Sequence, residues 1–161
     1  MEIEIKYENS FLDEKEHYMI YEYCKNAKYS YGESDNGDDI MTGMVHDIPE
    51  TEIIYKVLRK KLEDKCPFIR QLKLYRMYIN CFAPSEKPYF HTDGENGITF
   101  LYYPNTEWSL NDGGETQFLI DDNIYGIIPL PNRLVMFPAN IWHKATSFRN
   151  HHRFSIAIKY S

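Results

Sequence analysis

The sequence changes character near residue 66, and this change constrains the fold more than any other feature. Six segments after this point are short, rich in β-branched or aromatic residues, and bounded by Gly, Pro, Asn or Asp. They span residues 69–82, 97–105, 114–120, 124–130, 132–139 and 152–160. This pattern predicts an antiparallel structure of about six to eight short strands.

The first third of the chain has helical periodicity instead. In the segment 10–27, apolar residues are interspersed with charges, and Asn9 or Ser10 is suited to cap a helix. The segment 49–66 begins with Pro49, which favours a helix start. Its apolar residues form one helical stripe: Ile53, Ile54, Val57, Leu58 and Leu62.

Helices followed by strands favour a mainly β fold in which two or three N-terminal helices pack on one sheet of a jelly-roll or cupin-like barrel. The chain has 161 residues, 43% of them hydrophobic, which is enough for one domain with a substantial core. We expect a single domain over residues 1–161, with residues 1–66 as mainly helical support and residues 67–161 as the β core.

Composition excludes several classes of function. The net charge of -6 argues against nucleic acid as a partner, and no apolar run is long enough to span a membrane. The N-terminus lacks the basic and then apolar order of a secretory signal. Cys24, Cys66 and Cys81 are odd in number and form no CxxC pair, which favours reduced thiols and a cytoplasmic location.

His91 and Asp93 lie two residues apart in a strand-like segment that ends in a glycine turn, so both side chains point to the same side. This pair alone is a weak signal for a metal site. His143 follows the predicted strand 132–139, and a barrel can bring it next to His91. Two His and one carboxylate predict a non-haem Fe(II) site with open ligand positions. The other histidines, His17, His46, His151 and His152, are assigned to surface or hydrogen-bonded core positions.

The last predicted strand has two distinct faces. Phe154, Ile156, Ile158 and Tyr160 form an apolar face, and the other face carries Arg153, Ser155, Ala157 and Lys159. A buried guanidinium at Arg153 needs an anion, and no acidic run lies nearby in sequence. The distal carboxylate of a dicarboxylate cosubstrate would supply it, with Ser155 as a second donor.

Five segments together resemble the Fe(II)/2-oxoglutarate-dependent oxygenases, and among them the prolyl-4-hydroxylase-like branch of small microbial and viral enzymes. They are HTD at 91–93, TFLYYPNTEW at 99–108, GGET at 113–116, PNRLVMFPANIWHKATSF at 131–148 and RFSIAIKY at 153–160. The resemblance covers roughly residues 70 to 160 and implies a double-stranded β-helix. Related enzymes often carry Trp where this chain has Lys159.

The resemblance also implies the site. Fe(II) is expected on His91, Asp93 and His143, which are the catalytic residues, and 2-oxoglutarate is expected to chelate the iron. Residues expected around the cosubstrate are Arg153, Tyr103, Tyr78, Ser155, Thr99 and Leu101. Residues expected to contact the substrate are Arg76, Asn80 and Trp142.

The predicted activity is O2-dependent hydroxylation of an unactivated C–H bond with release of succinate and CO2, and ascorbate is a candidate reductant. A prolyl residue in a peptide or protein is the first candidate substrate, and a small molecule or free amino acid is the second. A non-catalytic, cupin-like metal-binding or scaffold protein is the alternative from another class. By resemblance, a virus or phage is a candidate source.

The acidic segment 33–39 has two readings. It forms either a solvated loop with a turn at Asn36-Gly37 or a mobile lid over the substrate site.

Overall fold

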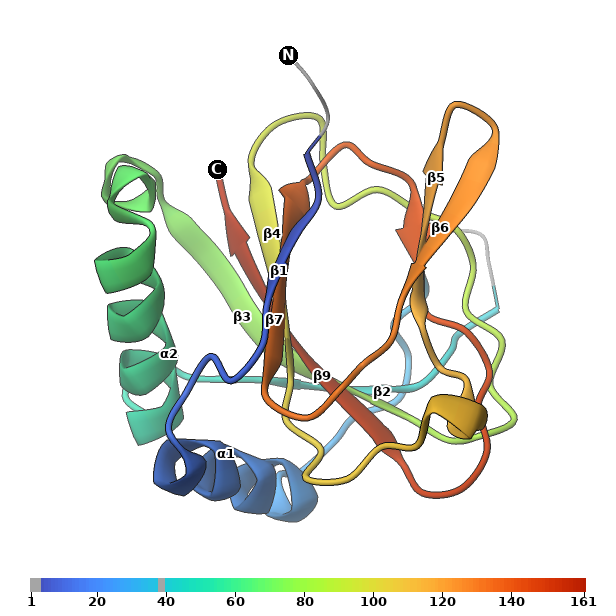
Figure 1. Ribbon diagram of the computed structural model, residues 1–161, viewed down its shortest axis with the longest axis horizontal. Helices are drawn as coiled ribbons and strands as arrows, with labels where there is room; N and C mark the ends of the chain where they lie inside the picture. Colours follow the sequence, from blue (N-terminus) through green and yellow to red (C-terminus); the bar gives the residue numbers. More distant parts are fainter. Residues whose placement is uncertain (1–3, 38–39) are drawn as a thin grey trace.

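The computed structural model describes residues 4–37 and 40–161, and within these ranges two antiparallel sheets face each other (Figure 1). The larger sheet has the order β1-β7-β4-β9-β3-β2. Its strands are β1 (Lys6–Glu8), β7 (Arg133–Pro138), β4 (Ile98–Tyr103), β9 (Arg153–Tyr160), β3 (Leu74–Phe82) and β2 (Met44–Asp47). The smaller sheet has the order β6-β5-β8, with β6 (Asn123–Ile127), β5 (Thr116–Ile120) and β8 (His143–Lys144).

Two helices, α1 (Glu14–Asn26) and α2 (Ile53–Lys65), cover the outer face of the larger sheet (Figure 1). Two short 3-10 helices span Pro67–Gln71 and Leu110–Asp112. This mainly β architecture, with helices on one sheet of a jelly roll, confirms the predicted fold class. No helix in the described part of the chain is long and apolar enough to cross a membrane.

All six predicted strands occur, as β3, β4, β5, β6, β7 and β9. The sequence prediction missed β1, β2 and β8, which are three, four and two residues long. Segments this short contain too few residues for a period of two to stand out. Since β1 and β2 both join the larger sheet, the first 66 residues contribute strands as well as helices.

The predicted start of α1 is wrong. Asp13 is the N-cap, and a reciprocal capping box links it to Glu16. Ser10 has a positive φ of 53°, and the next residue donates its backbone N–H to the Asn132 carbonyl. The loop between β6 and β7 therefore holds the chain in a non-helical conformation until Asp13.

The predicted start of α2 is also too early, because the helix begins at Ile53 after Glu52 as N-cap. Ile54, Leu58 and Leu62 are fully buried as predicted. Ile53 is 57% exposed, so it does not belong to the apolar stripe.

Strand β9 divides two cores, as its alternation predicts. Ile156 and Ile158 pack with the helices on the outer side. Ala157 belongs to a second core between the two sheets, with Phe118 from β5 and Phe137 from β7. The inner face of β9 therefore faces the space between the sheets.

Candidate active site

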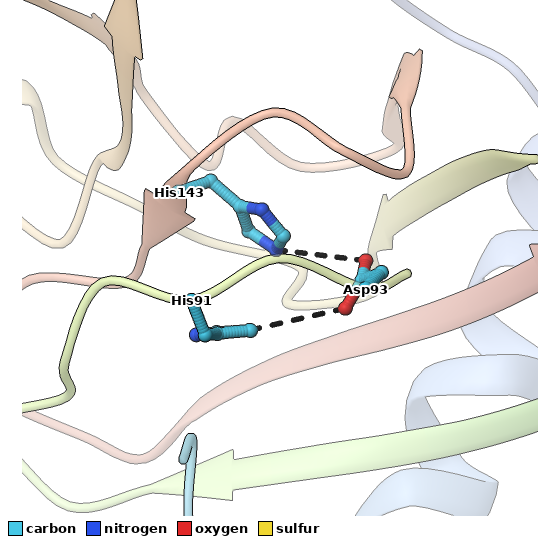
Figure 2. A group of neighbouring side chains, drawn as sticks. All are labelled: His91, Asp93 and His143. Carbon is cyan, nitrogen blue, oxygen red and sulfur yellow. Dashed lines mark ion pairs between the residues drawn. The ribbon is translucent and has the colours of Figure 1, made fainter. Parts of the chain in front are cut away.

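His91, Asp93 and His143 meet between the two sheets, because backbone pairing brings their segments together (Figure 2). His91 and His143 exchange two backbone hydrogen bonds, with N···O distances of 3.0 and 2.9 Å. The Asp93 N–H donates to the Ala139 carbonyl at 2.8 Å. One potential ligand atom from each side chain lies within 4.8 Å of the other two. The structure thus gathers the three residues predicted to bind metal.

Both histidine rings are oriented by carbonyls two residues earlier in the chain. Nδ1 of His91 lies 3.0 Å from the Tyr89 carbonyl oxygen, and Nδ1 of His143 lies 2.9 Å from that of Ile141. Because a carbonyl only accepts, each Nδ1 carries the hydrogen and each Nε2 keeps a lone pair. The Nε2 atoms face Asp93, at 3.9 Å from Oδ1 and 3.6 Å from Oδ2. This tautomer is the one that binds a metal through Nε2.

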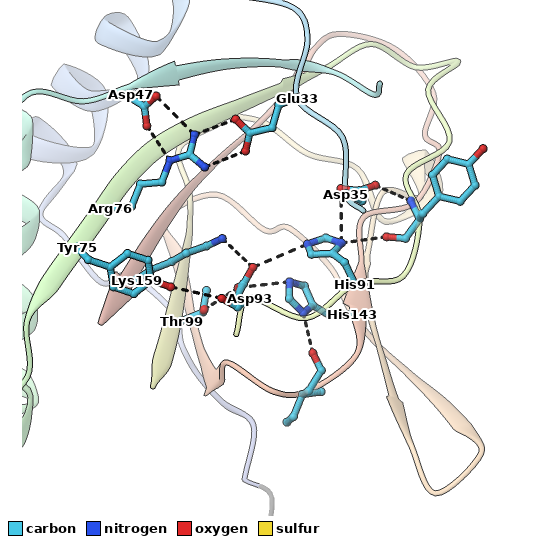
Figure 3. Close-up of polar contacts among 12 residues, drawn as sticks. Glu33, Asp35, Asp47, Tyr75, Arg76, His91, Asp93, Thr99, His143 and Lys159 are labelled. Atoms are coloured by element: carbon cyan, nitrogen blue, oxygen red, sulfur yellow. Dashed lines mark hydrogen bonds and ion pairs between the residues drawn. The ribbon is translucent and has the colours of Figure 1, made fainter. Parts of the chain in front are cut away.

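The Asp93 carboxylate is held from two sides (Figure 3). Thr99 Oγ1 donates to Oδ2 at 2.6 Å, and Lys159 Nζ lies 2.8 Å from Oδ1. Burial by itself raises the pKa of Asp93. His143 and Lys159 lower it by a larger amount, so the pKa lies below its usual value. The side chain, which is 3% exposed, is therefore ionised and held in a fixed position.

Burial also decides the charge of His143. It lowers the pKa of this imidazole to about 4, with His91 adding to the shift and Asp93 opposing it. The ring is neutral near pH 7, as a metal ligand must be. Two imidazoles and one carboxylate match the donor set of non-haem Fe(II) sites, so these residues fit a ferrous ion.

Arg153 lies fully buried at the start of β9. Its guanidinium donates to the Gly114 carbonyl at 2.8 Å and to Thr116 Oγ1 at 2.9 Å, and it lies 5.4 Å from the centre of the Tyr103 ring. No Asp or Glu among the described residues forms an ion pair with it. Burial lowers the pKa of Arg153 although Tyr103 and Glu115 oppose this shift, which reflects the cost of burying a cation that has no carboxylate at ion-pair distance.

A cavity of about 160 Å³ connects Arg153 with His91, Asp93 and His143, which are called the triad below. Ser155 and Leu101, both expected near the cosubstrate, line this cavity. Tyr78 and Asn80 on β3 line it too, which agrees with the predicted polar face of that strand.

Two further predicted cosubstrate residues support the cavity from behind rather than line it. Thr99 is fully buried and binds Asp93. Tyr103 is also fully buried, and its hydroxyl shares a hydrogen bond of 2.6 Å with Thr116 Oγ1. Tyr103 therefore contacts the hydroxyl that binds Arg153, and its predicted contact with the cosubstrate stays a prediction.

Two predicted substrate residues lie outside the cavity. Arg76 is bound by Glu33 at 2.9 and 2.8 Å and by Asp47 at 2.8 Å, so its guanidinium links β3 to the end of β2 and to the loop between α1 and β2 (Figure 3). Trp142 is 50% exposed, on the side of its segment opposite to the buried His143. Neither side chain faces the triad in this structure.

Sequence reasoning did not select Thr116 or Lys159, although both line the cavity. For Lys159 a signal was available, since it shares a strand face with Arg153 and Ser155. Nothing in the sequence indicated that its partner would be Asp93. Thr116 is part of the GGET segment but was not selected by itself, because its role depends on the position of Arg153, which is 37 residues away.

The described part of the acidic segment borders the cavity. Glu33, Ser34 and Asp35 line it, and Asp35 accepts the Tyr89 N–H at 2.6 Å and lies 3.5 Å from His91 Nδ1. Asp38 and Asp39 of the same segment lie outside the described residues. Action of this segment as a lid stays a prediction.

Comparison with known families agrees with this geometry. Residues 77–160, more than half of the chain, match the 2OG-Fe(II) oxygenase superfamily, where 2OG is 2-oxoglutarate. The chain belongs to this superfamily and is a 2-oxoglutarate-dependent dioxygenase. Membership implies iron and 2-oxoglutarate as cofactor and cosubstrate. A search of curated protein sequences finds no match.

Solved structures share the fold at low sequence identity. A Pseudomonas putida prolyl-4-hydroxylase is 15% identical with a TM-score of 0.78, over 99% of this chain and 92% of that chain. A Trichoplax adhaerens prolyl hydroxylase, solved with a hypoxia inducible factor peptide, is 17% identical with a TM-score of 0.77, over 97% and 82%. HygX from Streptomyces hygroscopicus, solved with nickel and 2-oxoglutarate, is 10% identical with a TM-score of 0.73, over 98% and 82%.

Proposed function

We propose that this dioxygenase hydroxylates an unactivated C–H bond, with a prolyl residue in a peptide or protein as the first substrate class. The reaction consumes one O2 and one 2-oxoglutarate and yields the alcohol, succinate and CO2. The observation that carries the proposal is a cavity with the His91, Asp93 and His143 cluster on its wall and a buried cation without an ion-paired carboxylate, Arg153, at another point. The prolyl part is supported by the likeness to two prolyl hydroxylase structures.

In this proposal, His91 Nε2, Asp93 and His143 Nε2 hold the ferrous ion. When bound, the ion supplies O2 activation and 2-oxoglutarate supplies two electrons through its oxidative decarboxylation. Arg153 receives the distal carboxylate of 2-oxoglutarate, because it is the cation of the cavity that has no carboxylate at ion-pair distance. Ser155 lines the same cavity and donates a second hydrogen bond to this carboxylate.

The remaining wall residues orient and shield the reacting groups. Thr99 keeps the Asp93 carboxylate in place, which a site of this precision requires. Leu101 and Ala157 present apolar surface beside the triad and exclude water from the cosubstrate. Three unpaired thiols support a reducing compartment, in line with the proposed cytoplasmic location.

The test is turnover with Fe(II), 2-oxoglutarate, ascorbate and a set of proline-containing peptides. We expect a peptide-dependent rise in succinate and a product heavier by one oxygen atom. The variant Asp93→Ala should abolish both signals, and His152→Ala, at an exposed histidine, should keep them. Succinate formation that no proline peptide stimulates would remove the prolyl substrate and leave the dioxygenase standing.

A small molecule or free amino acid is the second candidate substrate, because a lysine ammonium, that of Lys159, lines the cavity beside the triad. Assays with metabolites in place of peptides distinguish the two classes. Iron binding without turnover across both sets would instead support the non-catalytic binding protein.

A further inference from the structure

Lys159 occupies an unusual place for a lysine. Its side chain is only 12% exposed, on the inner face of β9, and its ammonium lies 2.8 Å from Asp93 Oδ1 (Figure 3). Lysine is rarely buried, because the charge loses its hydration. A cation beside a predicted metal ligand therefore calls for a functional reason.

Lys159 and Arg153 lie at opposite ends of the inner face of β9. They are six residues apart, which is about 20 Å along a strand. The triad lies at the Lys159 end, because Thr99, the partner of Asp93, pairs directly with Lys159. A five-carbon diacid that reaches from Arg153 to the metal occupies the stretch between them. Lys159 then stays beside the triad, on the side that remains for the substrate.

The other charged groups near this end have their own partners. Arg76, directly opposite Lys159 on β3, is bound by Glu33 and Asp47. Asp35 accepts the Tyr89 N–H and lies on the far side of the His91 ring. The acceptor of Lys159 is different in kind, because Asp93 must also bind the metal.

An ammonium group has three donors. The ion pair with Asp93 uses one of them and the hydrogen bond with the Tyr78 side chain uses another, which leaves one for a ligand. The Tyr78 ring lies on another side of the ammonium, with its centre 5.0 Å from Nζ. Once Asp93 shares its charge with a divalent ion, Lys159 is left with an incompletely compensated charge in a low-dielectric cavity. A carboxylate from the substrate would restore the balance and make a charge-assisted hydrogen bond.

We propose that Lys159 is a specificity-determining residue that binds a carboxylate of the substrate. The substrate class is then a molecule with its own carboxylate close to the carbon that is hydroxylated, which means a free amino or imino acid or a C-terminal residue. This inference rests on the proposed hydroxylase function and narrows it, since an internal prolyl residue has no carboxylate to offer.

The experiment uses the full chain loaded with Mn(II) and 2-oxoglutarate, so that the metal and Arg153 are already engaged. Free amino acids, including L-proline, are titrated against their matching amides, and binding is followed by calorimetry and by water-proton relaxation of the Mn(II). We expect at least one acid to bind about ten- to a hundredfold more tightly than its amide, the range of a charge-assisted hydrogen bond.

Variants assign the preference to one side chain. Lys159→Met should bring the ratio of acid to amide affinity close to one, and Lys159→Arg should keep most of it. Lys60→Met, the same change at an exposed lysine of α2, should leave the ratio unchanged. Equal affinity for acids and amides in the wild type, or an intact preference in Lys159→Met, would overturn the proposal.

The affinities for Mn(II) and 2-oxoglutarate are measured on every sample. A wild-type chain that binds neither contradicts the proposed function itself. A chain that binds both but does not prefer acids contradicts only the role of Lys159. If Lys159→Met loses Mn(II) through a displaced Asp93, Lys159→Gln replaces it, because its amide can still donate to Asp93 but carries no charge; an intact preference for acids in Lys159→Gln would likewise overturn the proposal.

Discussion

Arg153 carries a charge in a fully buried position, and the groups that accept its hydrogen bonds are neutral. Replacing such a cation by an apolar side chain removes a desolvation cost as well as two hydrogen bonds. We therefore expect Arg153→Met to leave the melting temperature of the ligand-free protein unchanged or higher. The same variant should lose the rise in melting temperature that 2-oxoglutarate gives the wild type in the presence of Mn(II).

Thermal unfolding with and without 2-oxoglutarate measures both effects. Arg149→Met, at an exposed arginine nearby in the chain, is the control and should respond to 2-oxoglutarate like the wild type. A full response in Arg153→Met would show that the distal carboxylate binds elsewhere.

Thr99 acts on the metal only through Asp93. Thr99→Val keeps the shape of this buried side chain and removes the 2.6 Å hydrogen bond to Oδ2. Loss of such an outer partner typically weakens metal binding, so we expect Mn(II) affinity to fall by about 10- to 100-fold. Calorimetric titration with Mn(II) tests this, with the exposed Thr106→Val as control. Unchanged affinity would mean that Lys159 alone holds the carboxylate.

At the level of single elements, α1 begins where its capping box forms. Asp13→Ala removes the side-chain acceptor for the Glu16 N–H, a bond of 2.7 Å. We expect a loss of about 1 kcal/mol in the free energy of unfolding, measured by urea denaturation. Glu14→Ala in the first turn loses only its interaction with the helix dipole, so we expect the free energy of unfolding to fall by only about 0.3 kcal/mol. An equal effect of the two changes would contradict the assigned cap.

The short strand β8 positions His143 although it has only two residues. It pairs with β5 on one side, and His143 forms a backbone bridge with His91 on the other. The imidazole also packs against Phe137 of the larger sheet, with ring centres 4.7 Å apart. These contacts fix the ring from several directions, so a strand too short to be recognised in the sequence can still carry a predicted metal ligand.

For the whole molecule, the predicted metal connects the two sheets. His143 belongs to the smaller sheet, whereas Asp93 is bound by Thr99 and Lys159 of the larger one. A ligand that binds only the folded state raises the free energy of unfolding by about 2.7 kcal/mol when its concentration is a hundred times its dissociation constant. We expect Mn(II) at this level to raise the melting temperature by about 5–10 °C, and a chelator to reverse the rise.

Differential scanning calorimetry provides this measurement. Asp93→Ala should melt at the same temperature with and without Mn(II), which assigns the effect to the triad. An equal rise in that variant would place the stabilising ion at another site.

The sequence by itself determined the features that depend on local patterns. The alternation along 153–160 predicted which residues of β9 face the cavity, because side chains alternate along any strand. The spacing of His91 and Asp93 predicted that both side chains share one side of a strand. The segment is not a strand and forms only an isolated bridge at His91, so backbone bonds to His143 and Ala139 position the two side chains instead. The run of short, β-branched and aromatic segments after residue 66 predicted the class of fold, since strands with apolar faces must pack against other elements.

Only the tertiary structure decided the features that depend on residues distant in sequence. The backbone bond to Asn132 holds the chain near Ser10 in a non-helical conformation. Ion pairs with Glu33 and Asp47 hold Arg76 outside the cavity. Lys159 forms its ion pair with Asp93. In each case several polar or charged residues could have been the partner, and the local sequence pattern does not distinguish between them. The choice is made when the sheets close, because burial then makes an unpaired charge or hydrogen-bonding group costly.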